Sequence, residues 1–179
     1  MQKGEGKNHL LSDGLEVPAF IDTLVYRMAS VLNAPSEELV LILKGHLLIE
    51  EQVTSIIRQN VEDFAPLETA RLSFDQKLRV AKAIGGELFS DASFDAARAI
   101  NKMRNKIAHQ PEPPDLQAMI DEFLADHGSY PALVEELKDY TTRRSKLKAM
   151  IAFLLGRFGS IVDSMPKDLE KKRMLVRAK

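Results

Sequence analysis

Residues 36–60 constrain the fold more than any other stretch, because they predict a helix that is apolar on most of its sides. Ser36 is placed to cap this helix, and Glu37 and Glu38 in its first turn complement the helix dipole. The apolar positions recur at helical spacing on one face and continue on a second. The first face holds Leu39, Ile42, Leu43, His46, Ile49, Val53, Ile56 and Ile57, and the second holds Val40, Leu41, Leu47 and Leu48. A helix of this kind needs neighbours on several sides, so it is expected at the centre of the domain.

The composition of the whole chain favours helix over sheet. Ala, Leu, Ile, Glu and Lys are plentiful, whereas aromatic residues make up only 6% of the 179 residues. The chain has no cysteine, which excludes disulfides, thiolate metal sites and cysteine nucleophiles. Its formal net charge of −1 does not indicate a nucleic-acid-binding protein, so any such role depends on local patches.

Apolar spacing and helix-end signals predict the remaining helices. Ser73 and Gln76 fit a capping box, and Gly85-Gly86 are expected to end the helix that follows. Ser90, Asp91 or Ser93 can cap the next one. The predicted helices are 19–32, 36–60, 73–84, about 90–109, 115–126, and a last helical region over 129–165 with a break near Thr141-Thr142. We therefore expect an all-α protein, an up-and-down helical bundle of about five to seven helices.

The same patterns predict one domain with two flanking segments. Residues 1–17 are polar and are expected to form a flexible arm, residues 18–165 the bundle, and residues 166–179 a tail with six basic and two acidic residues. No run approaches the ~20 apolar residues that a membrane-spanning helix requires, and residues 1–14 lack an apolar run of signal-peptide length. We expect a cytoplasmic protein that does not cross a membrane.

The segment 99–109 combines an arginine, an asparagine and a histidine at the end of a predicted helix. Three prolines between residues 111 and 114 cannot continue that helix, so His109 is expected at or just past its end. Asn105 and His109 share a helix face. Arg104 and His109 would be about 140° apart in an unbroken helix, and they can converge only if the helix ends there. The three side chains are the candidate functional site.

Arg104, Asn105 and His109 form an Arg-Asn-x-x-x-His pattern that resembles the R-x4-6-H signature of the HEPN superfamily of small helical proteins. The resemblance covers about residues 36–110 and is greatest to the mannitol-repressor-like branch. It implies a bundle that forms a homodimer, with two Arg-His sets in a cleft at the interface. Many relatives are metal-independent ribonucleases, often toxins with an antitoxin partner, whereas others are non-catalytic regulators. The resemblance places Arg104 and His109 at the two signature positions and Asn105 at the polar one.

RNA cleavage by its own 2′-hydroxyl needs a group that moves protons near neutral pH and a cation that stabilises charge on the phosphate. Histidine and arginine suit these roles, so His109 is predicted to move protons and Arg104 to bind the phosphate. Asn105 can orient the imidazole or bind phosphate. No cofactor and no metal are predicted. Some family toxins carry a modified tyrosine two residues past the histidine, but Pro111 stands there in this chain, which makes control by that route doubtful.

His46 and Glu50 are predicted to support the site. They lie four residues apart on the apolar stripe of helix 36–60, where a buried polar pair needs a partner. They can pair with each other or with the Arg104 cluster, and His46 can equally be a satisfied core histidine.

Two functional hypotheses follow. The first is a homodimeric endoribonuclease with RNA as its substrate. The second is a non-catalytic, mannitol-repressor-like transcriptional regulator or protein-interaction module, in which the same residues make interface hydrogen bonds. Positive residues are also favoured in the last turn of any helix, which alone can account for Arg104 and His109.

Overall fold

The computed structural model describes residues 37–110, 113–127 and 137–165. The protein is all-α, and these residues form a helical bundle without strands. The helices are α2 (Glu38–Arg58), α3 (Ala65–Thr69), α4 (Phe74–Gly85), α5 (Asp91–His109), α6 (Leu116–His127) and α8 (Arg143–Ser164), with a 3₁₀ turn at Gly86–Leu88. The expected arm 1–17, helix 19–32 and tail 166–179 lie outside the described residues.

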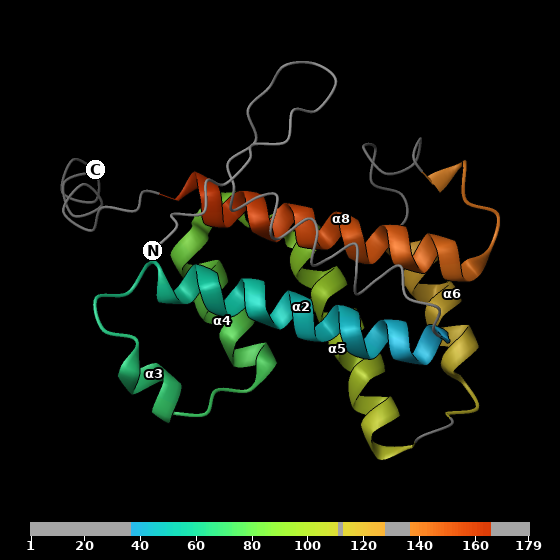
Figure 1. The fold of residues 1–179 in the computed structure, drawn as a ribbon, viewed down its shortest axis with the longest axis horizontal. Helices are drawn as coiled ribbons and strands as arrows, with labels where there is room; N and C mark the ends of the chain where they lie inside the picture. Colours follow the sequence, from blue (N-terminus) through green and yellow to red (C-terminus); the bar gives the residue numbers. More distant parts are fainter. Residues whose placement is uncertain (1–36, 111–112, 128–136, 166–179) are drawn as a thin grey trace, which may run out of the picture. The chain divides into compact units, whose positions relative to one another are not determined.

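Helix α2 is the central element, as its apolar pattern predicts. It packs against α8, α4 and α5, and Figure 1 shows α2 and α8 running side by side. Leu41, Ile42 and Ile49 are among its fully buried side chains. Leu47, on the second apolar face, is 63% exposed, so that face is not covered along its whole length.

Gly45 allows α8 to approach α2 closely. A Cβ atom at this position would lie 2.8 Å from two side-chain atoms of Ile151 on α8, which is too short for a carbon–carbon contact. The sequence predicts a close neighbour at Gly45, and that neighbour is the buried side chain of Ile151. The α2–α8 interface therefore depends on a residue without a side chain.

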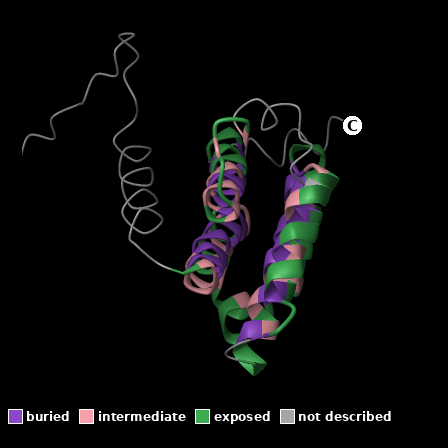
Figure 2. Cartoon of the chain, turned by 90° about the vertical axis from the view of Figure 1, so that its right-hand side faces the viewer, coloured by how far each residue is buried: buried purple, intermediate pink, exposed green. Residues whose placement is uncertain are grey.

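The apolar stripe of α8 lies inside the bundle. All eight stripe positions predicted from the sequence are buried: Leu147, Met150, Ile151, Leu154, Phe158, Ile161, Val162 and Met165. At the sequence level such a stripe can pack within the bundle or form a dimer surface. The structure shows that it packs within the bundle. Figure 2 shows the buried residues on the faces that the helices turn toward one another and the exposed residues on the outward faces.

Local signals in the sequence set most of the helix ends. Ser73 and Gln76 form the predicted capping box, and the side chain of Ser90 accepts a hydrogen bond from the backbone N–H of Ser93. Helix α4 ends at Gly85, followed by Gly86 in a left-handed conformation with φ of 52°. Helix α2 differs, since its N-cap residue is Glu37 and makes no side-chain capping bond.

The sequence does not predict α3, because Pro66 indicates a connection between residues 60 and 72. Pro66 instead lies in the first turn of this five-residue helix, where a missing N–H costs nothing. A helix so short contains too few residues to show apolar periodicity.

Gly45→Ala tests the close approach of α2 and α8. Overpacking costs about 1–3 kcal/mol, and the gain in helix propensity offsets roughly 1 kcal/mol of it. We therefore expect the variant to lose up to about 2 kcal/mol of unfolding free energy in urea titrations. Gly156 on α8 is the matched control, since a Cβ there meets nothing within 4 Å, and Gly156→Ala should gain about 0.5–1 kcal/mol. Equal stabilisation by both changes would contradict the packing described.

Candidate functional site

Helix α5 carries the three signature residues on its last turns. It continues through His109, and the chain leaves the helix only at Gln110, which is extended and whose N–H donates to the carbonyl of Lys106. The helix therefore ends at His109, as the sequence predicts. No hydrogen bond or ion pair joins Arg104 to His109 within the described part of the chain. Their predicted convergence within one chain is not found.

Asn105 contacts Arg104 and lies one turn from His109. The guanidinium Nη1 of Arg104 donates to the Oδ1 of Asn105 at 3.0 Å. Asn105 and His109, one turn apart, both line an open hollow between the end of α5 and the start of α6. Asn105 is thus the residue that links Arg104 to the hollow lined by His109. Arg104 is half-buried, whereas Asn105 and His109 are exposed.

The hollow has a mixed charge. Helix α5 contributes Lys102 and Lys106 beside His109, and the opposite wall contributes Asp115 and Glu122. Lys106 Nζ lies 3.1 Å from Asp115 Oδ2, and this hydrogen bond lowers the pKa of the Asp115 carboxyl. Lys106 is therefore paired with a carboxylate. Lys102 forms no ion pair with any residue that the structure describes.

His46 and Glu50 lie in a separate polar cluster that connects α2, α4 and α5. The imidazole of His46 is 2% exposed, and its Nε2–H donates to the Oδ1 of Asn101 on α5 at 3.0 Å. It also packs against the ring of Phe74 with centroids 4.6 Å apart. Its Nδ1 has no hydrogen-bond partner in the described structure, since the Glu50 carboxylate is 3.9 Å away. The Glu50 carboxylate instead accepts a 2.7 Å hydrogen bond from Lys77 on α4.

The environment of His46 favours its neutral form. Burial lowers the pKa of the imidazole below its ordinary 6.5, and the positive charges of Arg104 and Lys77 lower it further. The bond to Asn101 and the charge of Glu50 oppose this shift without cancelling it. The charge of Arg104 therefore acts on His46 although no hydrogen bond or ion pair between them is found among the described residues.

Sequence reasoning did not identify Asn101 and Lys77 as partners of the predicted pair. Asn101 lies one turn before Asn105 on α5, and Lys77 lies in the second turn of α4. Helical spacing from Asn105 could have indicated Asn101, but no local pattern marks Lys77. In the ranges 37–110, 113–127 and 137–165, no group of three or more His, Cys, Asp or Glu side chains could hold a metal ion, and no helix has the length and hydropathy to cross a bilayer.

Searches with protein-family models, among curated proteins and among solved structures found no match to this chain. The relation to HEPN proteins is therefore a resemblance of the motif and its helical setting.

The lowered pKa of His46 predicts a pH dependence of stability. An unfolded histidine titrates near 6.5, whereas the folded protein holds His46 neutral to a lower pH. The stabilisation is fully present above pH 6.5 and is lost as the pH falls through the folded pKa. In that window the unfolding free energy should fall by up to about 1.4 kcal/mol per pH unit.

The measurement is urea unfolding of the parent and His46→Gln at several pH values. The variant should lose this slope, because glutamine does not titrate. Parallel curves for the two proteins between pH 5 and 7 would show that His46 is not the responsible group.

Proposed function

We propose that the protein is a HEPN-like homodimer that acts on RNA as a metal-independent endoribonuclease, with Arg104, Asn105 and His109 as its site. One observation carries the proposal: Asn105 binds Arg104 and lines the same hollow as His109. In this proposal Arg104, held by Asn105, binds the phosphate, and His109 in the wall of the hollow transfers protons. The hollow has room for an extended substrate because it is open to solvent.

The proposed reaction is attack by the RNA 2′-oxygen on the adjacent phosphorus. The P–O5′ bond breaks as the new P–O2′ bond forms, which leaves a 2′,3′-cyclic phosphate and a 5′-hydroxyl. One proton leaves the 2′-hydroxyl and one reaches the departing 5′-oxygen, and imidazoles can perform both transfers. Arg104 uses one N–H on Asn105, so its other donors remain for phosphate oxygens.

The proposed dimer brings a second His109 and a second Arg104 to the site. One His109 can act as base while the second acts as acid, and the Arg104 of one copy can meet the His109 of the other across the interface. This arrangement accounts for the separation of Arg104 and His109 within one chain. An antitoxin or other regulatory protein that covers the hollow would be the natural partner of such an enzyme.

A second function rests on a different observation. Asp115 and Glu122 on the α6 wall repel phosphate, and Asp115 already engages Lys106. A non-catalytic, mannitol-repressor-like transcriptional regulator or interaction module would use these same polar groups to bind a partner protein. The cleavage assay below distinguishes the two functions.

Purified protein should cleave single-stranded RNA in the presence of EDTA and leave 2′,3′-cyclic phosphate ends. Arg104→Ala and His109→Ala should each lower the rate by about 100-fold or more, as the loss of a charge-stabilising donor or a general acid–base group does. Asn105→Ala should have a smaller effect, because it removes only the group that holds Arg104. Arg157→Ala, an exposed arginine on α8, is the matched control and should cleave at the parental rate. Equal background cleavage by all these proteins would reject the enzyme and favour the regulator.

Solution mass tests the dimer independently. Light scattering of the parent should give twice the 20.1 kDa of one chain. A mass of one chain at every concentration would remove the composite site.

A further inference from the structure

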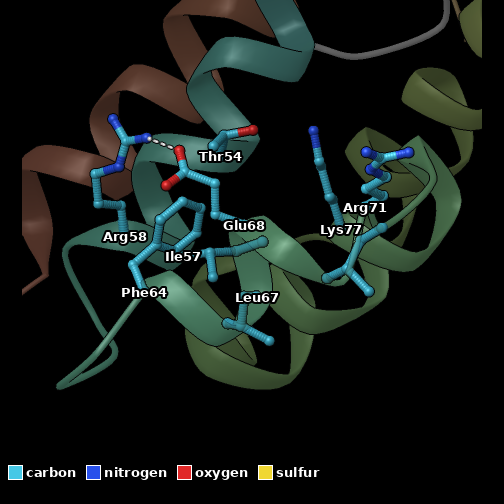
Figure 3. Close-up of a pocket in the computed structure, with 9 residues that line it drawn as sticks. Thr54, Ile57, Arg58, Phe64, Leu67, Glu68, Arg71 and Lys77 are labelled. Carbon is cyan, nitrogen blue, oxygen red and sulfur yellow. Dashed lines mark ion pairs between the residues drawn. The ribbon is translucent and has the colours of Figure 1, made fainter.

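A second pocket lies away from the α5 hollow and shares no residue with it. It is formed by the C-terminal half of α2, by α3 and by the start of α4 (Figure 3). Its volume is about 140 Å³. Ile57, Phe64 and Leu67 give it an apolar wall, and its lining also holds Arg58, Arg71 and Lys77. Neither the signature motif nor the proposed cleavage uses these groups.

The cations of this pocket outnumber its carboxylates. Three positive side chains line it together with one carboxylate, that of Glu68. Glu68 pairs with Arg58 at 3.5 Å, and the guanidinium of Arg58 also lies 4.8 Å from the centre of the Phe64 ring. Figure 3 shows this pair on one side of the pocket and Arg71 and Lys77 together on the other. On the other side Lys77 pairs with the Glu50 carboxylate at 2.7 Å, so among the described residues the unpaired positive charge there is that of Arg71.

Lys77 and Arg71 have donors to offer a ligand. Lys77 gives one hydrogen bond to Glu50 at 2.7 Å, which leaves two of its three ammonium protons. The guanidinium of Arg71 has no hydrogen-bond or ion-pair partner among the residues that the structure describes. A planar fork of free N–H groups beside an ammonium matches the oxygens of a carboxylate or phosphate.

The backbone at Arg71 is strained. Its φ of 49° is the one left-handed conformation of a non-glycine residue in the described ranges, and it follows directly on the end of α3. Glycine adopts this conformation without cost and asparagine at a lower cost than arginine. A change of Arg71 to glycine therefore removes the side chain without adding strain to the turn.

We propose that this pocket binds a small organic anion whose carboxylate or phosphate head is held by Arg71 and Lys77 and whose apolar body lies against Phe64, Ile57 and Leu67. The size sets the class of ligand, because an engineered cavity of about 150 Å³ holds benzene. The enclosed part of the ligand is thus about as large as one benzene ring. A nucleic acid or a folded protein segment does not fit inside.

The test measures binding of phenyl phosphate and of benzoate to the full-length protein by calorimetry. At least one should bind saturably, and the comparison identifies the preferred head group. Inorganic phosphate and benzyl alcohol each lack one half of the ligand, so both should bind at least about tenfold more weakly.

Arg71→Gly separates the role of the side chain from that of the fold. The change relieves the strained backbone, so its melting temperature should equal or exceed that of the parent, whereas its affinity for the anion should fall about tenfold or more. Arg157→Ala removes the same charge at an exposed position of α8 and should bind as the parent does. The proposal is overturned if neither anion binds saturably at millimolar concentration, or if Arg71→Gly binds as tightly as the parent.

Discussion

Helix α2 contacts two different helices through two consecutive residues, and the rest of the structure depends on this packing. Gly45 admits the side chain of Ile151 from α8, and His46 reaches Asn101 on α5. Adjacent helical residues point about 100° apart, so this one step in the chain joins α2 to two different helices. The position of α5 is thereby tied to the core, and its last turns carry Arg104, Asn105 and His109.

Two polar systems meet along α5. Asn101 belongs to the buried cluster of His46, and Asn105 one turn later belongs to the exposed hollow. Arg104 interacts with both groups, since it binds Asn105 and its charge contributes to the lowered pKa of His46. The buried imidazole is held neutral by its surroundings and serves the architecture, whereas the exposed His109 is free to meet a substrate. The sequence already predicts proton transfer by His109 and a supporting or core position for His46, and the structure adds the difference in burial between them.

The sequence predicted the parts of the fold that depend on local chemistry. The capping box at Ser73 and the stop at Gly86 each involve neighbours in the chain, and the α8 stripe follows from helical spacing. Contacts between distant segments were not predictable in this way. The partners of His46 and Glu50 are 55 and 27 residues away, so no spacing rule identifies them. The end of α5 at His109 was predictable from the prolines that follow, but helix termination alone does not bring His109 to Arg104.

The central claim is that Arg104, Asn105 and His109 act on one substrate from one exposed hollow. The most direct measurement is a nuclear magnetic resonance titration with a short RNA whose cleavable 2′-hydroxyls are replaced by hydrogen. We predict that the side-chain signals of Arg104, Asn105 and His109 shift together with one dissociation constant. The signals of the buried His46 and of its partner Asn101 should change little. RNA binding that leaves the three signature side chains unaffected, or the absence of binding, would contradict this prediction.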